Sequence, residues 1–444
     1  MRLSIRLEYP RLHWEIKVTI LKVILPSSRQ IIPFNEPARD LRLQNKPLWL
    51  IQRDVLSKYT HSELQLAIDQ PLPKTNEACV VYRDNLYFDD AFMSYFLNAA
   101  QKGGKAVQAA LKLSDQAFRE HCLPLSDSYQ QIGDTYLLEL WYYPEGPSEN
   151  ADPLIMDLQS QEIGYYHVPT YMATNAGDLV YYVPLRSIIA IDSWVHVFIA
   201  DCVFGVFGRG ARFEDELKTN PFFKLKILIT SMLEGKQLLQ CSRLVRKGQN
   251  CTIDPSAVIN GPVTIGDNVT IGAGVIIENC IIGNNVNISQ GCNLMLSVIG
   301  DGTFLPFRAS LFMTTVMDNS MVAQNTCLQM SVIGRNSFVG AGTTFTDFNL
   351  LPQKLRARNA SGDLANSNRP VLGGCVGHNC RIGAGMIIFP ARTIESDVVL
   401  VSSNERRVID HDVHFEDSDH HSFVTGVLHK RLYPRDLNTK PETW

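Results

Sequence analysis

The 444-residue sequence has no block of basic residues and no excess of positive charge. Its 41 lysines and arginines are outnumbered by 45 aspartates and glutamates, which gives a formal net charge of −4. Nucleic acid is bound by basic surfaces that displace counterions from phosphates, so this composition argues against nucleic acid as a partner. With 45% apolar and 19% charged residues, the chain is expected to be globular and long enough for two domains.

Three further features are missing. The ten cysteines include no C-x-x-C pair, which favours a reducing compartment over a disulfide framework. Charged residues interrupt every apolar run near the N-terminus, so no signal peptide is expected. The most apolar stretch, residues 187–207, contains Asp192, His196 and Asp201, and these groups are costly inside a lipid bilayer. We therefore expect a soluble cytoplasmic protein without a transmembrane segment, and peripheral contact with a membrane stays open.

Aliphatic residues recur at every sixth position in the second half of the chain. The period begins with Ile253, Ile259 and Ile265 and continues, with one-residue slips, to Leu400. It fits neither a helix nor a single strand and is typical of a three-sided solenoid with roughly 18 residues per rung. Segments such as "IGDN" and "IGRN" supply glycine and asparagine where the chain turns a corner. We predict a β-helix of hexapeptide repeats over residues 246–401, with a loop insertion at about 346–370 and a polar tail over 402–444.

The first half of the chain follows a different pattern. Residues 17–25 and 78–82 are predicted strands, and residues 89–104 have the apolar spacing and terminal glycines of a helix. This alternation predicts an α/β domain over residues 17–245, preceded by an extension over 1–16. A helix is also predicted within residues 220–240, with Asn220 as its cap and Pro221 at its first position.

Together the two parts resemble the sugar-1-phosphate nucleotidyltransferases that carry a left-handed hexapeptide β-helix, such as the bacterial N-acetylglucosamine-1-phosphate uridyltransferases. The resemblance is strong over residues 251–400 and weaker over 17–245. It implies a Rossmann-like α/β domain followed by a left-handed parallel β-helix. It also implies transfer of a nucleotidyl group from a nucleoside triphosphate to a sugar 1-phosphate, with release of pyrophosphate. A Mg²⁺ cofactor and a trimer assembled through the β-helix belong to the same expectation.

The family's phosphate-binding turn, of the form GxGTR, is altered in this chain. Residues 18–34 occupy the place of the first strand and its turn, and Arg29 falls where the family's arginine would lie. Pro26, Ser27 and Ser28 replace the glycines. The backbone is then expected to approach a pyrophosphate less closely, and Pro26 has no amide hydrogen to donate.

The next segment, which in the family carries a phosphate-binding lysine, is altered as well. Ala38 stands where the resemblance places a phosphate-binding lysine, and Arg39 and Arg42 are the candidate replacements. Lys46 keeps the family's spacing in "NKPL". The resemblance therefore implies that Arg29 and Lys46 contact the phosphates of the substrates.

Two aspartates match the metal-binding positions of the family. Asp84 follows a predicted strand in "YRDN", and Asp192 precedes a predicted helix in "AIDSW". Hard carboxylates at these positions would hold Mg²⁺ beside the reacting phosphates. The residues by themselves leave a structural role open, because Asp84 suits a turn and Asp192 suits a helix cap.

The altered phosphate turn keeps a second class of function open. In this second class, the chain is a catalytically inactive relative that binds a sugar nucleotide or serves only as an oligomeric scaffold. A third possibility, acyl transfer on the solenoid, requires a histidine to deprotonate the acceptor. No histidine occurs between His196 and His378, and we expect His378 to occupy a solvated corner. The histidines of residues 411–421 are expected to be solvated rather than to bind a metal.

Overall fold

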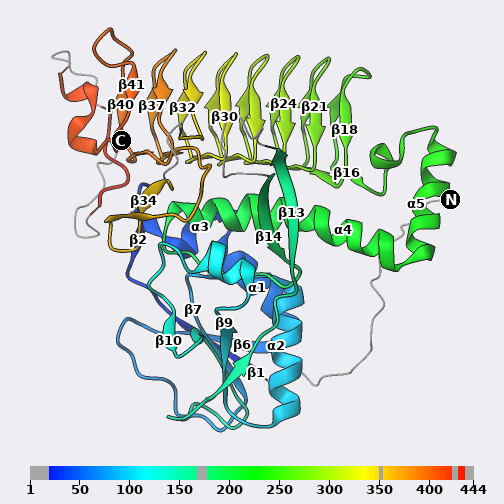
Figure 1. The fold of residues 1–444 in the computed structure, drawn as a ribbon, viewed down its shortest axis with the longest axis vertical. Coiled ribbons are helices and arrows are strands. Elements are labelled where there is room, and N and C mark those ends of the chain that lie inside the picture. The colour runs from blue at the N-terminus through cyan, green and yellow to red at the C-terminus, as the bar shows by residue number, and fades with distance from the viewer. Residues whose placement is uncertain (1–19, 168–177, 350–353, 423–428, 436–444) are drawn as a thin grey trace.

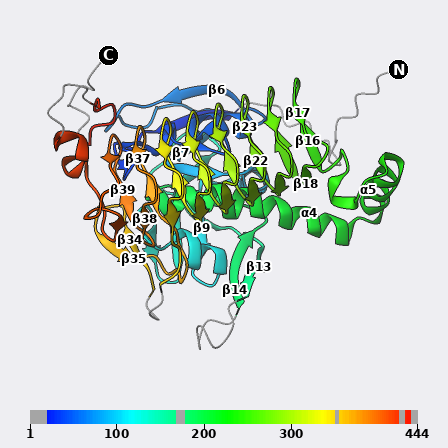
Figure 2. The same cartoon turned by 90° about the horizontal axis from the view of Figure 1, so that it is seen from above.

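The computed structural model describes residues 20–167, 178–349, 354–422 and 429–435. An α/β sheet domain lies alongside the length of a parallel β-helix, and one long helical segment runs between the two (Figure 1). Figure 2 shows the same coil from above, with the sheet domain behind it. This is the predicted fold: a mixed α/β domain followed by a left-handed parallel β-helix.

The N-terminal sheet brings two strand ends together at one edge. In spatial order its strands are β12 (Asp152–Ile155), β9 (Val107–Lys112), β11 (Thr135–Tyr143), β7 (Cys79–Arg83), β1 (Ile20–Leu25) and β6 (Thr60–Gln65), with β10 (Gln130–Ile132) paired to β11. Strand β1, next to the edge strand β6, is parallel to both β6 and β7, whereas β11 is antiparallel to β7 and β9. Because β1 and β7 are parallel neighbours, the residues that follow them lie side by side.

Helices complete the sheet domain. Helix α1 spans Leu48–Leu56, and α2 spans Asp90–Gly103, as the sequence predicts for residues 89–104. Asp89 caps α2 by accepting a hydrogen bond from the backbone N–H of Phe92 at 2.8 Å, and Gly104 ends it with a φ of 62°. Strand β8 (Leu86–Phe88) pairs with β15 (Ile188–Ala190), and β13 (Ser160–His167) pairs with β14 (Asp178–Pro184).

The segment between the two regions is a core helix. It consists of α3 (Trp194–Phe198), the π-helix η3 (Ile199–Phe207) and α4 (Gly208–Thr219). By length and composition it is the one helix within the described ranges that could cross a membrane, but 83% of its apolar window is buried inside the protein. Helix α5 (Pro221–Glu234) follows, and Asn220 caps it by accepting from Phe223 N–H at 3.1 Å, as predicted.

The β-helix consists of three eight-stranded parallel sheets. The first contains β16 (Val245–Lys247), β19 (Val263–Ile265), β22 (Ile281–Ile282), β25 (Val298–Ile299), β28 (Thr315–Val316), β31 (Val332–Ile333), β36 (Cys375–Val376) and β39 (Thr393–Ile394). The second contains β17 (Thr252–Ile253), β20 (Thr270–Ile271), β23 (Asn287–Ile288), β26 (Phe304–Leu305), β29 (Met321–Val322), β32 (Phe338–Val339), β37 (Arg381–Ile382) and β40 (Val399–Leu400). The third contains β18 (Val258–Asn260), β21 (Ile276–Glu278), β24 (Asn293–Met295), β27 (Ser310–Phe312), β30 (Cys327–Gln329), β33 (Thr344–Phe345), β38 (Ile387–Ile388) and β41 (Val408–Ile409).

The predicted inward positions form the interior of this coil. Ile253 pairs with Ile271, and Ile271 pairs with Ile288, so equivalent residues stack directly on one another in successive rungs. Ile271 and Ile288 belong to a continuous buried column of aliphatic side chains. A Cβ atom on Gly266 would lie 2.6 Å from the backbone of Gly283 in the next rung, which explains the glycines at these corners. Strand β41 continues the coil beyond residue 401.

Shorter elements connect these parts. They are β2 (Gln30–Ile31), β3 (Glu36–Pro37), η1 (Ala38–Asp40), β4 (Arg42–Leu43), β5 (Lys46–Pro47), η2 (Phe118–Cys122), η4 (Leu238–Gln240), β34 (Arg356–Arg358), β35 (Leu364–Asn366), η5 (Phe415–Asp417) and η6 (Asp419–Ser422).

The outer face of the coil packs into the hydrophobic core of the sheet domain, whereas the interior of the coil is a separate cluster. Met330 and Leu372, both from the coil region, belong to the same buried cluster as the sheet domain. The inserted loop folds back over the sheet domain, where Ala360 N–H donates to the carbonyl of Leu125 at 3.1 Å. Ser193 Oγ also donates to the carbonyl of Arg358 at 2.9 Å. The insertion therefore contacts the N-terminal domain of its own chain.

Candidate functional site

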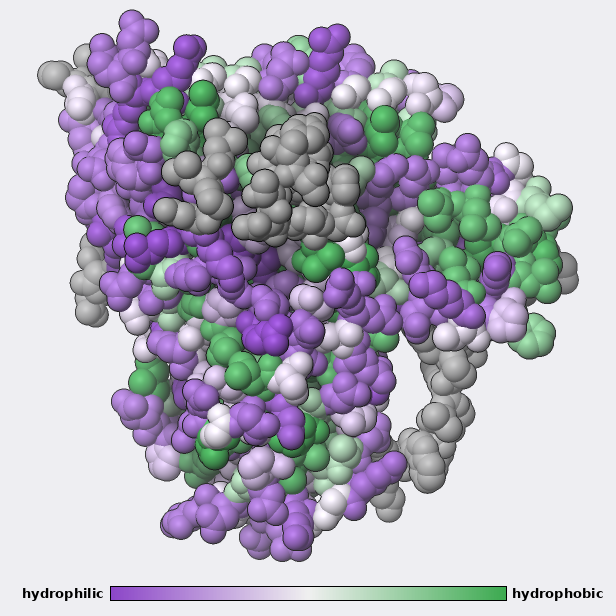
Figure 3. Space-filling view, viewed as in Figure 1, coloured by the Kyte–Doolittle hydropathy of each residue, from purple (hydrophilic) through white to green (hydrophobic). Residues whose placement is uncertain are grey.

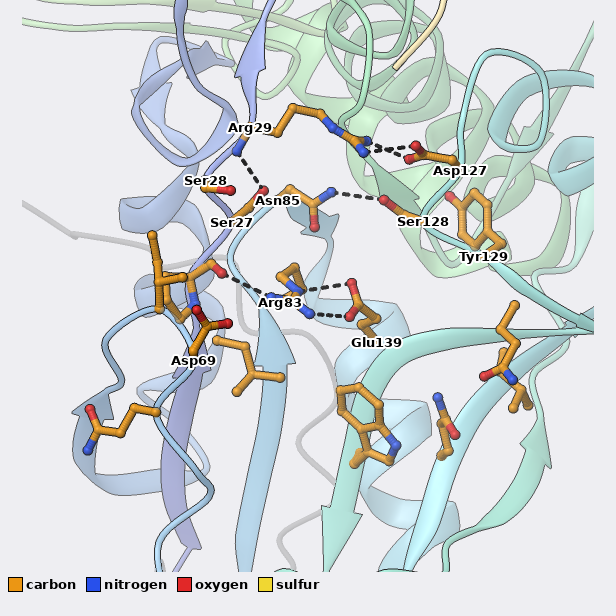
Figure 4. A pocket seen from close by; sticks show the side chains of 18 of the residues that line it. Ser27, Ser28, Arg29, Asp69, Arg83, Asn85, Asp127, Ser128, Tyr129 and Glu139 are labelled. Carbon is orange, nitrogen blue, oxygen red and sulfur yellow. Dashed lines mark hydrogen bonds and ion pairs between the residues drawn. The ribbon is translucent and has the colours of Figure 1, made fainter. Parts of the chain in front are cut away.

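A pocket of about 770 Å³ opens at the carboxyl ends of β1 and β7 (Figure 4). In open α/β sheets, ligands bind at this edge of the parallel strands. The turn after β1, residues 26–29, forms one wall, and Arg83 and Asn85 at the end of β7 form the next. Residues 127–130 and the strand β11 close the opposite side with Glu139 and Trp141.

The backbone amides of the 26–29 turn are largely engaged within the protein. Ser27 N–H donates to Asp84 Oδ1 at 2.8 Å, and Arg29 N–H donates to Ser27 Oγ at 3.3 Å (Figure 4 shows the second bond). Pro26 has no N–H, and its carbonyl accepts from Arg83 Nη1 at 2.9 Å. A phosphate cradle needs several free amides that point at the ligand, so this turn is poorly suited to hold a pyrophosphate.

Arg29 lies in the pocket, but two carboxylates neutralise it. Its guanidinium binds Asp127 through two parallel hydrogen bonds, Nη1 to Oδ1 at 2.5 Å and Nη2 to Oδ2 at 2.8 Å. Nη1 also lies 3.3 Å from Asp192 Oδ1. The hydrogen bonds to Asp127 and the charge of Asp192 raise the pKa of Arg29. This guanidinium is charged, paired on both sides and held in one orientation.

Arg83 forms the second neutralised pair. Its Nε donates to Glu139 Oε2 at 3.0 Å, and Nη2 bonds to Glu139 Oε1. The hydrogen bonding to Glu139 raises the pKa of Arg83. Figure 4 shows the two arginines on the same side of the pocket, each facing its carboxylate partner across the opening.

Asp192, the first predicted metal ligand, lies behind the pocket wall with its side chain fully buried. Its Oδ1 accepts from Asn85 Nδ2 at 2.9 Å and from Ser128 Oγ at 2.8 Å, and its Oδ2 accepts from Ser126 Oγ at 2.5 Å. The helix cap is the next residue, Ser193, whose Oγ accepts from Val195 N–H at 3.3 Å. Asp192 therefore organises the pocket wall rather than the helix start.

Asp84, the second predicted metal ligand, lies in the two-residue turn between β7 and β8. Besides the bond from Ser27, its other oxygen, Oδ2, is buried without a hydrogen bond and lies 3.6 Å from Arg39 Nη1. Burial raises the pKa of Asp84 to about 6. Arg39, a candidate replacement for the missing lysine, thus faces Asp84.

The remaining candidates for phosphate contacts lie elsewhere. Lys46 is about half exposed, pairs with Asp54 at 2.7 Å and does not line the pocket. Arg42 binds Asp318 of the coil at 2.9 Å. Within the segment expected to bind phosphate, Arg42 instead joins the sheet domain to the β-helix.

The arrangement does not fit a magnesium ion. Within the described ranges, no three His, Cys, Asp or Glu side chains come together, so any Mg²⁺ would depend on the two predicted aspartates. Asp192 already accepts from two hydroxyls and an amide and faces Arg29, and the open oxygen of Asp84 faces Arg39. Guanidinium groups occupy the positions where a cation would neutralise these carboxylates.

His378 corrects one sequence-based expectation. It was predicted to be solvated, but it is fully buried because the sheet domain covers this corner of the coil. Its Nδ1 accepts from Arg335 N–H at 2.8 Å, and its Nε2 lies 3.2 Å from Glu36 Oε1. Burial lowers the pKa of His378. Among the histidines of residues 411–421, His411 is exposed as expected, whereas His420 is largely buried.

Sequence reasoning missed the two residues that neutralise the pocket arginines. Asp127 lies in the polar segment "LSDSYQQ", and Glu139 lies in the apolar strand β11. A charged residue within an otherwise apolar strand is the one signal that could have drawn attention to Glu139. Asp127 carries no comparable signal, because a polar turn with aspartate is common.

Comparison with known proteins places the sequence similarity in the coil. Residues 243–306, which form the first rungs, match the family model described as the GMPPB C-terminal domain. The chain is also similar to a solved structure of a putative acetyltransferase, the product of the BC4754 gene of Bacillus cereus. That similarity has 22% identity and a TM-score of 0.16, and covers 22% of this chain and 69% of the other. The family match supports a β-helix region of the sugar nucleotidyltransferase type.

Proposed function

We propose that the N-terminal pocket binds a sugar, either free or as the sugar end of a sugar nucleotide, without transferring a nucleotidyl group. The β-helix then serves as the scaffold that carries this binding domain. The observation that supports this most directly is the pairing of both pocket arginines with carboxylates, Arg29 with Asp127 and Arg83 with Glu139. In nucleotidyl transfer such cations would be needed for the triphosphate.

The charge of the lining favours an uncharged ligand. Two cationic side chains, Arg29 and Arg83, are matched by three anionic ones, Asp69, Asp127 and Glu139. A triphosphate would have to separate the existing ion pairs and approach the released carboxylates. That exchange costs free energy at a partly buried site, because each carboxylate would be left without its partner.

The uncharged part of the lining suits hydroxyl groups. Asn85 Oδ1 is buried and has no hydrogen-bond partner among the described residues, although the Nδ2 of the same side chain is engaged. Asn85 lines the pocket, so a small shift of its side chain would offer this acceptor to a ligand hydroxyl. Gln108, Gln130 and Trp141 add amide groups and a flat apolar ring to the same pocket, a combination that suits the polar edges and apolar faces of a sugar ring.

Binding is tested by isothermal titration calorimetry with uncharged monosaccharides, sugar nucleotides and nucleoside triphosphates. We expect heat of binding from at least one sugar or sugar nucleotide and none from triphosphates. Gln130→Ala should weaken binding several-fold through the loss of one ligand hydrogen bond. The matched control is Gln131→Ala, because both residues are exposed on β10 but only Gln130 lines the pocket. Equal affinities for the two variants would contradict the assignment of the pocket.

Catalysis is tested by pyrophosphate release over a panel of nucleoside triphosphates and sugar 1-phosphates in the presence of Mg²⁺. We expect no release above the protein-free blank. Release that is abolished in Arg29→Ala would instead support an active nucleotidyltransferase and would overturn the proposal.

A further inference from the structure

Helix α5 exposes an apolar face that nothing in the described ranges covers. Phe222 and Leu233 are each 82% exposed and Met232 is 73% exposed, values unusual for large apolar side chains. With 3.6 residues per turn, the exposed apolar side chains fall on one face about 140° wide: Phe222, Leu225, Leu228, Ile229, Met232 and Leu233. Figure 3 shows this face as a continuous apolar surface over α5, at the end of the molecule.

The opposite face of α5 attaches the helix to the rest of the protein. Ile227 is fully buried and Ser231 nearly so. Ile227 packs with Cys241 and Leu244 in a small cluster separate from the main core. The orientation of α5 is therefore fixed, and its apolar face points outward as part of the fold.

Basic residues border the apolar face. On the same helical projection, Lys226 lies at one edge of the face and Lys224 at the other, and both are exposed. From the start of α5 to the end of β16, residues 221–247, the chain has six basic residues and one acidic residue, a local charge of +5. The whole chain has a formal charge of −4, so this end differs in sign from the molecule as a whole.

An outward apolar face bordered by lysines is the pattern of a helix that lies in a membrane interface. Its apolar side chains enter the region between headgroups and acyl chains, and its lysines reach back to the headgroups. A second copy of the chain is the poorer fit, because pairing two such faces about a two-fold axis would bring their lysine borders together. Anionic headgroups complement these lysines.

We propose that α5 docks the protein on the surface of a membrane rich in anionic lipids. Helix α5 protrudes at the end of the coil, beyond the sheet domain (Figures 1 and 2). It can therefore contact a flat surface without obstruction by that domain. The pocket at β1 and β7 would then stay open to solvent, since it lies in the sheet domain away from α5.

Co-sedimentation of the purified full chain with vesicles tests this proposal. One set contains phosphatidylcholine alone, and the other contains phosphatidylcholine mixed with phosphatidylglycerol. We expect binding to the mixed vesicles at least about tenfold tighter than to the neutral ones. The double variant Lys224→Glu/Lys226→Glu should lose this preference. Equal sedimentation with both vesicle types, or with neither, would overturn the proposal.

A matched pair of variants tests the apolar part. Leu225→Glu should abolish vesicle binding, whereas Ile132→Glu in the sheet domain should not, although the two side chains are equally exposed at 56% and 54%. Light scattering after size exclusion, without lipid, provides the competing outcome. If Leu225→Glu converts an oligomer to a monomer and the native chain ignores vesicles, the face joins copies of this chain and the proposal fails.

Discussion

The coil and the sheet domain position their side chains by different rules. In the coil each inward residue has an equivalent directly above and below it, as Ile253, Ile271 and Ile288 do. In the sheet domain each contact is made once and often joins distant residues, such as Arg29 and Asp127, which lie 98 positions apart. A single substitution can therefore change the pocket while the coil remains recognisable. The family match within residues 243–306 is consistent with this difference.

The apolar interface between the two regions predicts that they nevertheless unfold together. Leu372→Ala should lower the free energy of unfolding by about 2–5 kcal/mol, because Leu372 is fully buried in the cluster that joins them. Hydrogen exchange of peptides from the sheet domain and from the coil reports on each region separately. Both should show the same loss of stability.

The control for this substitution is Ile276→Ala, since Ile276 is 39% exposed on the outside of the coil. Its effect should stay within about 0.5 kcal/mol. If Leu372→Ala destabilised only one of the two regions, the coil and the sheet domain would be domains that fold independently.

Most of the coil could be predicted from the sequence because repetition reports the same physical requirement many times. Each inward position has the same preference for an aliphatic residue in successive rungs. A single exception, such as a one-residue slip, therefore does not obscure the period. The helix from Pro221 to Glu234 was predictable for a related reason: its cap, Asn220, and its first proline act locally. Local rules of this kind need no knowledge of the rest of the fold.

The pocket could not be predicted to the same extent. The position of Asp84 beside Ser27 follows from the parallel pairing of β1 and β7, but the pairing of Arg29 with Asp127 depends on how a loop crosses the sheet edge. The burial of His378 has a similar cause. The hexapeptide pattern places it at a corner, and the sheet domain then covers that corner through Glu36.

Buried histidines in both regions, among them His196 and His378, predict a shared sensitivity to acid. His196 and His378 each accept a backbone N–H at Nδ1, and burial lowers the pKa of both. The unfolded chain binds protons at these histidines below about pH 6.5, whereas the folded chain resists protonation. Stability present at neutral pH should therefore fall as the pH drops below that value.

Calorimetry from neutral pH down to about pH 5.5 measures this loss. His378→Gln and His196→Gln should each reduce the fall in melting temperature at acidic pH. His411→Gln, at an exposed position, should leave this fall unchanged. A native chain whose melting temperature does not fall over this range would show that these histidines are protonated within the fold.

The smallest effect is predicted for the response of Asp84 to pH and to Mg²⁺. This response tests whether the pocket still supports metal-dependent chemistry. The pKa of Asp84 is raised to about 6, so the folded state holds this proton more tightly than the unfolded chain does. The resulting stabilisation is complete below about pH 4 and is lost as the pH rises through about 6. Asp84→Asn, which keeps an acceptor for Ser27 N–H, should remove this pH dependence. At pH 7 Asp84 is ionised, the form that burial disfavours, so Asp84→Asn should raise the free energy of unfolding there rather than lower it. Millimolar Mg²⁺ should leave the melting temperatures of both proteins unchanged, because Arg29 and Arg39 already face the two carboxylates. If Mg²⁺ raised the melting temperature of the native chain but not that of Asp84→Asn, Asp84 would be a metal ligand. That result would support catalysis.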